Sequence, residues 1–376
     1  MLIKNATYTN ADFKFTRGDI LCENGIIKAI GEALTGDDVL TLPEDSVVLP
    51  GFIDIHTHGC AGADTGDATH EAFDTMSKYH ATHGVTSFCP TTMTDSEQKL
   101  IDVFTAAAAF SGKESGAYIH GINMEGPYIS YDKKGAQPEE FIRKPSLDEF
   151  AMLNSIFRIS LIDVAPEAEG AAGFASVASK ICTVSAAHSN ADEQTALKAY
   201  KSGFSHATHL FNAMSGMNAR NPGVAGVALD MGATCELICD GFHVSPTMLS
   251  LAFKLLGRDR AVVVSDSMRS AGLPDGEYTL GAQTVYVKDG KARLADGTIA
   301  ASTSNLHEEF LNLLDFGIEF EQALRACTIN PARVIGVSEK TGSIKINKQA
   351  DFVILDSNFD IHTVIIGGKV AFTAHD

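Results

Sequence analysis

Six residues of the kinds that bind metal ions stand at or just after the ends of apolar segments. They are His56, His58, Glu125, His188, His209 and Asp266. Alternate residues of a β-strand point to the same face, so His56 and His58 can bind one ion together. Burying a carboxylate such as Glu125 is costly unless a cation or hydrogen bonds compensate its charge. Core histidines and a structural ion pair are the alternatives for each motif alone, but the set together predicts a metal site.

Histidine nitrogens and carboxylate oxygens are suitable ligands for Zn²⁺, Fe²⁺, Co²⁺ or Mn²⁺. A divalent ion with an open coordination position polarises a carbonyl group and lowers the pKa of bound water to about 7. Water that is activated in this way can attack an amide. A carboxylate must then carry a proton to the leaving amine, and Asp266 is the candidate for this acid and base role. The residues therefore predict a metal-dependent amidohydrolase.

Apolar runs of strand length recur through the middle of the chain, and each is followed by a helix-like stretch. This alternation is typical of βα repeats in a parallel sheet. Eight runs end at 53–56, 87–90, 122–125, 163–166, 184–188, 207–210, 237–240 and 263–266. Eight repeats favour an α/β fold of the (β/α)8 TIM barrel type, with its chemistry at the carboxyl ends of the strands. A doubly wound open sheet is the alternative, but no G-x-G-x-x-G turn or P-loop supports it.

Both ends of the chain contain short alternating segments that indicate β-strands. These segments are 1–8, 13–22, 25–30 and 45–49 near one end, and 342–346, 350–355 and 361–372 near the other. Two such groups of strands can pair with each other. We expect a small β-sandwich domain made of residues 1–50 and 340–376, and a catalytic barrel domain of residues 51–339.

The formal net charge of the 376-residue chain is −18. Since nucleic-acid binding requires a basic face, nucleic acid is not expected as a partner. An anionic substrate would need a few local cations, because the overall field repels it. No signal peptide or membrane-spanning apolar run is evident, so no membrane association is expected. Seven scattered cysteines without C-x-x-C spacing favour a reducing cytoplasm.

Eight ordered motifs extend over essentially the whole chain, most of them at or just beyond the ends of the expected strands. They are PGFID at 50–54, EGPYI at 125–129, KKGA at 133–136, VAPE at 164–167, HSNA at 188–191, THLFNAM at 208–214, DGFHV at 240–244 and SD at 265–266. Together they resemble the N-acetylglucosamine-6-phosphate deacetylases of the amidohydrolase superfamily. The resemblance implies hydrolysis of the acetamide of N-acetyl-D-glucosamine 6-phosphate to D-glucosamine 6-phosphate and acetate.

The resemblance also implies roles for individual residues. Glu125, His188 and His209 would hold one ion, with Asp266 as the acid and base. Some members of the family lack the His-x-His pair that is present here, so one or two ions per chain are expected, with Glu125 bridging them. The phosphorylated sugar would contact Ala136, Gln137, Asn212, Ala213, Arg220, His243, Ile299, Ala300 and Ala301.

Three of these substrate contacts carry specific expectations. In the family, residues at the positions of Arg220 and His243 act on the phosphate, with help across a dimer interface. We therefore expect a homodimer in which Arg220 and His243 lie near the neighbouring subunit's site. Many relatives have a histidine where this chain has Gln137, whose amide can donate the same hydrogen bond to the acetamide carbonyl.

Three alternative functions remain open. A cyclic-amide hydrolase would need a lysine at the end of the fourth barrel strand, where this chain has VAPE. A deacetylase of another N-acetylhexosamine phosphate, such as N-acetylgalactosamine 6-phosphate, differs only in the orientation of one hydroxyl group. An inactive binding protein would have lost Asp266 or a ligand, and none is lost. The other histidines are expected to be mostly solvated, namely His70, His80, His83, His120, His206, His307, His362 and His375.

Overall fold

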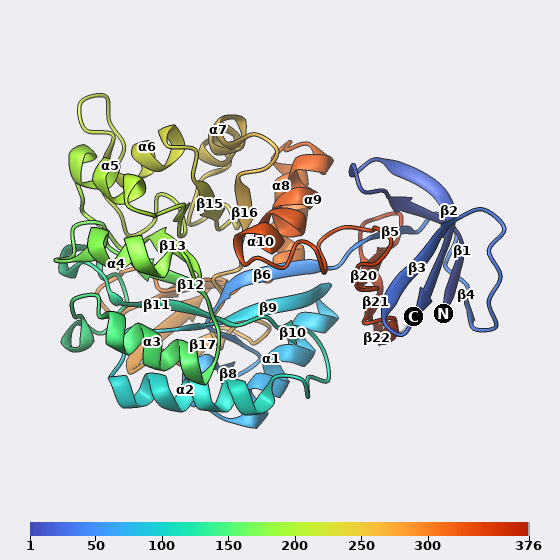
Figure 1. The fold of residues 1–376 in the computed structure, drawn as a ribbon, viewed down its shortest axis with the longest axis horizontal. Coiled ribbons are helices and arrows are strands. Elements are labelled where there is room, and N and C mark those ends of the chain that lie inside the picture. The colour runs from blue at the N-terminus through green and yellow to red at the C-terminus, as the bar shows by residue number, and fades with distance from the viewer. Residues whose placement is uncertain (375–376) are drawn as a thin grey trace.

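Eight parallel strands form a barrel in the computed structural model, which describes residues 1–374 (Figure 1). They are β6 (Phe52–Thr57), β9 (Val85–Thr92), β11 (Ile122–Tyr128), β12 (Ile159–Val164), β13 (Thr183–Ala186), β14 (His206–Ala207), β15 (Thr234–Leu237) and β16 (Ala261–Val263). Neighbours pair in that order from β6 to β16. The barrel closes where Thr57 bridges Ser267 and the Asp266 amide donates to His56 O over 2.9 Å. The predicted (β/α)8 barrel is confirmed.

A helix follows each barrel strand, as the βα repeat predicts. These helices are α1 (His70–Thr82), α2 (Glu97–Phe110), α3 (Leu147–Ile156), α4 (Ala171–Ala178), α5 (Glu193–Lys201), α6 (Gly223–Asp230), α7 (Pro246–Leu256) and α8 (Leu306–Asp315), with α9 (Phe320–Cys327) and α10 (Ile329–Val334) after them. Side-chain caps fix several starts: Ser96 accepts from the Lys99 amide, and Asn305 forms a capping box with Glu308. Within residues 1–374, no helix has the length and apolar character needed to cross a bilayer.

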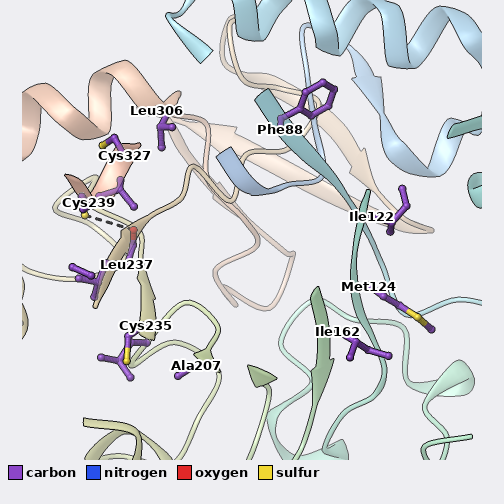
Figure 2. Packing of buried hydrophobic residues seen from close by; sticks show 14 of the residues in the cluster. Phe88, Ile122, Met124, Ile162, Ala207, Cys235, Leu237, Cys239, Leu306 and Cys327 are labelled. Atoms are coloured by element: carbon purple, nitrogen blue, oxygen red, sulfur yellow. Dashed lines mark hydrogen bonds between the residues drawn. The ribbon is translucent and has the colours of Figure 1, made fainter. Parts of the chain in front are cut away.

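The barrel strands are buried on both faces, which explains their nearly continuous apolar sequences. A large cluster packs the strands against the surrounding helices, and Figure 2 shows part of it, including Phe88, Ile122, Met124, Ile162, Ala207, Cys235 and Leu237. A second cluster, which includes Ile53, Leu161 and Val262, packs against residues of α10. Full burial of each such side chain contributes about 1.5–3 kcal/mol, so the strand ends are held rigidly.

The two chain ends form one eight-stranded sheet beside the barrel (Figure 1). Its strands are β1 (Leu2–Thr9), β2 (Phe15–Glu23), β3 (Ile26–Gly31), β4 (Val39–Leu40), β5 (Val47–Pro50), β20 (Phe352–Leu355), β21 (Ile361–Ile366) and β22 (Lys369–Thr373). The antiparallel pair β5 and β20 joins the two ends of the chain. The sheet folds over a core that includes Ile3, Ile20 and Phe352, and Ile26 bridges Gln349. The expected small β-sandwich is confirmed.

Residues 342–346, which were expected to form a strand, do not form one. The ammonium group of the buried Lys348 instead donates to Thr341 O over 3.0 Å and to Ser343 Oγ over 2.7 Å beside this segment. Ile344 still points into the core of the sandwich. Ile346 is 45% exposed, so the alternation of apolar residues indicates neither a strand nor a buried face here.

A three-stranded antiparallel sheet between β16 and α8 was not expected from the sequence. It consists of β17 (Gly276–Leu280), β18 (Gln283–Lys288) and β19 (Lys291–Arg293). The remaining short elements are β7 (Gly59–Cys60), β8 (Ala63–Asp64), β10 (Tyr118–Ile119) and the 3-10 helices η1 (Thr65–Asp67), η2 (Tyr131–Lys133) and η3 (Glu139–Phe141). The inserted sheet matters because Leu280 and the stretch after β19 reach the site described below.

Asp351 is a buried carboxyl group of the sandwich that gives a test of its stability. It accepts hydrogen bonds from the Gly367 amide over 2.8 Å and from the Thr341 hydroxyl over 3.1 Å. Burial raises the pKa of Asp351 from 3.8 to about 6, so ionisation destabilises the fold as the pH rises through 6. We expect Asp351→Asn to raise the free energy of unfolding by about 3 kcal/mol at pH 8, with a smaller gain at pH 5. Urea denaturation at both pH values measures this, and equal gains would contradict it.

Candidate active site

The six residues that the sequence marked as metal ligands converge at the carboxyl ends of five barrel strands. All six are at most 7% exposed. They form two adjacent groups, and the ligand atoms within each group lie within 4.8 Å of one another. One group is His56, His58 and Asp266, and the other is Glu125, His188 and His209.

Glu125 connects the two groups. Its Oε1 lies 3.0 Å from His188 Nε2 and 3.0 Å from His209 Nε2, and these two nitrogens are 3.2 Å apart. Its Oε2 lies 3.3 Å from His58 Nε2. Donor atoms around a tetrahedral ion with bonds of about 2.1 Å are separated by about 3.4 Å. The spacing therefore fits an ion shared by Glu125 and its histidine partners.

The second ring nitrogens of two histidines support the same conclusion. His188 Nδ1 lies 2.8 Å from Lys133 O, so it donates and leaves the Nε2 lone pair facing the cluster. His56 Nδ1 lies 2.9 Å from Glu236 Oε2 in the same way. His56 Nε2 is buried and has no hydrogen-bond partner among residues 1–374. A divalent cation would satisfy these lone pairs.

Three of the six residues have an unusual backbone conformation. His188, His209 and Asp266 have φ values of 43°, 31° and 45°, in the left-handed region that only a small fraction of non-glycine residues adopt. Such strain costs about 1–3 kcal/mol per residue and is concentrated at functional sites. Strands β13, β14 and β16 are thus each followed by a residue in the left-handed conformation whose side chain points into the barrel mouth.

The carboxylates and histidines of the cluster shift one another's pKa. Burial would lower the pKa of His58, but hydrogen bonds with Asp266 and Glu125 raise it to about 10. Burial opposes ionisation of Glu125, yet the hydrogen bonds of its histidine partners hold its pKa well below the usual range. Burial opposes ionisation of Asp266 too, but the charge of His56 and the hydrogen bond and charge of His58 together lower its pKa. Both carboxylates are therefore ionised at neutral pH and suited to a cation.

A cavity of about 330 Å³ opens over the cluster. Seven of the nine expected substrate contacts line it: Ala136, Gln137, Asn212, Ala213, His243, Ile299 and Ala301. Five further lining residues were not expected from the sequence: Met93, Gly135, Phe211, Leu280 and Thr298. Leu280 and Thr298 come from the inserted sheet and the segment after it, whose positions depend on tertiary structure and not on a local pattern.

Arg220 and Ala300 do not line this cavity. Arg220 is exposed in a turn, where its amide donates to Asn218 Oδ1, and Ala300 is buried beneath the cavity wall. His243 lines the cavity of its own chain. Its expected position, with that of Arg220, near the neighbouring subunit's site stays a prediction. Asp240 Oδ2 lies 2.6 Å from His243 Nδ1 and fixes the orientation of this ring.

Gln137 makes two hydrogen bonds within the site. Its Nε2 donates to Glu125 Oε2 over 2.5 Å, and its Oε1 accepts from the Thr94 amide over 2.6 Å. The amide is thus held between the cluster and the backbone, with one of its two N–H groups on Glu125. One contact of Gln137 thus orients a metal-ligand candidate, and its expected hydrogen bond to the acetamide carbonyl stays a prediction for the second N–H group.

The expectation that the remaining histidines are solvated was wrong. His206 and His80 are 0% and 3% exposed, and of the other expected cases only His70 is exposed, while His375 lies outside the described residues. His206 Nε2 lies 3.2 Å from Oε1 of Glu236, a buried residue that was also missed. Burial opposes ionisation of Glu236, but the charge of His56 and hydrogen bonds with both histidines lower its pKa to about 2. Its sequence signal was a carboxylate within an apolar strand.

Comparisons with known proteins agree with this geometry. The amidohydrolase family model matches residues 47–371. N-acetylglucosamine-6-phosphate deacetylase from Bacillus subtilis (strain 168) is 36% identical over 343 residues, which cover 89% of this chain and 87% of the relative. N-acetylgalactosamine-6-phosphate deacetylase from Escherichia coli O157:H7 is 33% identical over 338 residues, which cover 88% of this chain and 89% of the relative.

A solved structure of another deacetylase also matches this chain, at lower sequence identity. It is a mutant N-acetyl-D-glucosamine-6-phosphate deacetylase from Mycobacterium smegmatis in complex with N-acetyl-D-glucosamine-6-phosphate. It matches with a TM-score of 0.91 at 26% identity, over 99% of each chain. The barrel, its ligand cluster and these matches show that the chain belongs to the amidohydrolase family, within the group of N-acetylglucosamine-6-phosphate deacetylases.

Proposed function

We propose that the protein hydrolyses the acetamide of N-acetyl-D-glucosamine 6-phosphate to D-glucosamine 6-phosphate and acetate. The observation that carries this proposal is one cavity lined both by the ligand cluster and by His243, a group that can meet an anion. Its volume of about 330 Å³ is within the usual range of small-molecule sites. The relatives that match almost the whole chain act on N-acetylhexosamine phosphates.

Divalent cations are part of this proposal. Glu125, His188 and His209 would hold one ion, and the His56, His58 and Asp266 group would hold a second. Such cations supply Lewis acidity, which polarises the acetamide carbonyl and makes water more acidic. Zn²⁺, Fe²⁺, Co²⁺ and Mn²⁺ all suit this donor set, and zinc binds it without redox chemistry.

Asp266 is proposed to move the proton. Its Oδ1 lies 3.4 Å from His56 Nε2 and 3.3 Å from His58 Nε2, and the residue lines the cavity. Since its pKa is lowered, its carboxylate can accept a proton from the attacking water. It then gives that proton to the amine nitrogen as the C–N bond breaks, so the water oxygen ends in acetate.

His243 and Arg220 are proposed to meet the phosphate. Arg220 is exposed outside the cavity of its own chain, which supports a homodimer in which it reaches the neighbouring subunit's site. We expect Arg220→Ala to raise KM for the phosphorylated sugar by about tenfold or more, because a charge-assisted hydrogen bond contributes about 1.5–3 kcal/mol. KM for unphosphorylated N-acetylglucosamine should change little. Steady-state kinetics on both sugars would refute the role if the two effects were equal.

The decisive test combines metal analysis of the purified protein with acetate release from a panel of sugars. The panel contains N-acetylglucosamine 6-phosphate, N-acetylgalactosamine 6-phosphate and both unphosphorylated sugars. We expect the highest kcat/KM for the first. A preference for the second would support the alternative activity, which the similarity to the Escherichia coli relative favours. Release from none of them would overturn the proposal.

We also propose a compartment and a division of the chain. All seven cysteines are free and six are buried, which supports a reducing cytoplasm. The net charge of −18 argues against a nucleic-acid partner. We assign catalysis to residues 51–339, with residues 1–50 and 340–376 as the sandwich domain.

A further inference from the structure

Glu236 is a fully buried carboxylate on β15 that contacts the metal-ligand candidates from behind. Its neighbours Cys235 and Leu237 belong to the apolar cluster shown in Figure 2. Because alternate residues of a strand point to opposite faces, Glu236 points away from that cluster. Within residues 1–374, its ion-pair partners are His56 and His206.

Each oxygen of Glu236 has a defined partner. Oε2 lies 2.9 Å from His56 Nδ1 and accepts from the His209 amide over 3.2 Å. Oε1 lies 3.2 Å from His206 Nε2, and His206 Nδ1 in turn lies 2.6 Å from Thr234 Oγ1. One carboxylate thus contacts a residue from each of the two ligand groups, and its other oxygen contacts His206.

The hydrogen bond to His56 determines the tautomer of that ring. A carboxylate only accepts hydrogen bonds, so His56 Nδ1 must carry the proton. With Nδ1 engaged by Glu236, Nε2 is the nitrogen that can offer a lone pair to an ion, and it lies 3.5 Å from Glu125 Oε1 and 3.4 Å from Asp266 Oδ1. Without Glu236, the ring could rotate or change tautomer and present a proton in that direction.

We propose that Glu236 is a positioning residue that holds His56 with its Nε2 towards the cluster and so builds the second ion site of His56, His58 and Asp266. The proposal rests on the metal centre of the proposed function. A carboxylate that orients a histidine ligand typically changes metal affinity by about 10–100-fold. If Glu236 served only to stabilise the fold, its effect would instead come from the buried ion pair with His206.

The test is a calorimetric titration of the full chain with Zn²⁺ after removal of bound metal by chelation. The wild type should take up two ions, and Glu236→Gln should weaken one of them by about 10–100-fold while the other changes little. Glu309→Gln is the matched control, since Glu309 is also 0% exposed but hydrogen-bonds with Ser304 and, within residues 1–374, with no histidine. It should leave both affinities unchanged.

Two further variants separate positioning from folding. His206→Gln removes the structural pair but leaves Glu236 on His56, so the second ion should be retained. Glu236→Asp keeps a buried carboxylate but shortens it by one methylene; it replaces Glu236→Gln if that variant does not fold, and should also weaken the second ion. A weakening by His206→Gln equal to that by the Glu236 variant would overturn the proposal.

The control for coupling uses His56 itself. If Glu236 acts through His56, Glu236→Gln should cause no further loss of metal affinity in a His56→Ala background. An equal loss of both ions in Glu236→Gln, or a wild-type chain that binds only one ion, would overturn the inference. A wild-type chain that binds two ions but releases no acetate would overturn the proposed function and leave this inference standing.

Discussion

Asp266→Asn is expected to lower kcat by about 10²–10⁴-fold, the range that general acid and base catalysis contributes. Asparagine has nearly the same shape as aspartate, and its Oδ1 can still accept a hydrogen bond from His58. It cannot accept a proton from water or pass one to the amine. The loss should therefore appear in kcat, with little change in the KM for the phosphorylated sugar.

Metal content must be measured on the same preparation, because Asp266 belongs to one of the two ligand groups. The ion at Glu125, His188 and His209 should remain bound in Asp266→Asn. A turnover equal to that of the wild type would refute the proton-transfer role. A loss of both ions together with activity would assign Asp266 to metal binding alone.

The six ligand candidates were predictable because their positions follow from strand periodicity and strand ends. His188 and His209 end successive apolar runs, and a closed parallel barrel brings all such ends to one mouth. The position of a residue at a strand end and the meeting of strand ends at one mouth can both be inferred without knowing which side chains touch. The barrel itself was predictable for the same reason, since eight βα repeats need only local patterns.

The contacts that were missed depend on tertiary structure. Glu236 and His206 lie on adjacent strands about 30 residues apart, and neither shows its partner in the sequence. The inserted sheet of β17 to β19 has alternating apolar and polar residues. This alternation does not show which strands pair with each other. The hydrogen bonds of Gln137 with Glu125 and Thr94 likewise had no signal in the sequence. Side-chain orientation is the information that periodicity lacks.

Glu125→Gln is expected to abolish the uptake of both ions and to lower kcat by at least about 10³-fold, because Lewis-acid stabilisation contributes several kcal/mol. Glutamine has the shape of glutamate, but it lacks the negative charge that Glu125 shares with both ligand groups. Metal analysis and acetate release on one preparation measure both losses. Glu309→Gln is the control, since burial and the nearby charge of Asp240 raise the pKa of Glu309 well above its usual range and keep it neutral.

The hydrogen bonds around Glu125 explain why an isosteric amide cannot replace it. Gln137 donates to Oε2, so the oxygen of a glutamine at position 125 would face Gln137. Its NH₂ group would then replace Oε1, which lies 3.0 Å from both His188 Nε2 and His209 Nε2. Two N–H groups would point at the lone pairs that an ion needs, which blocks the site besides removing its charge. A Glu125→Gln variant that still binds two ions would show that the cluster does not hold them.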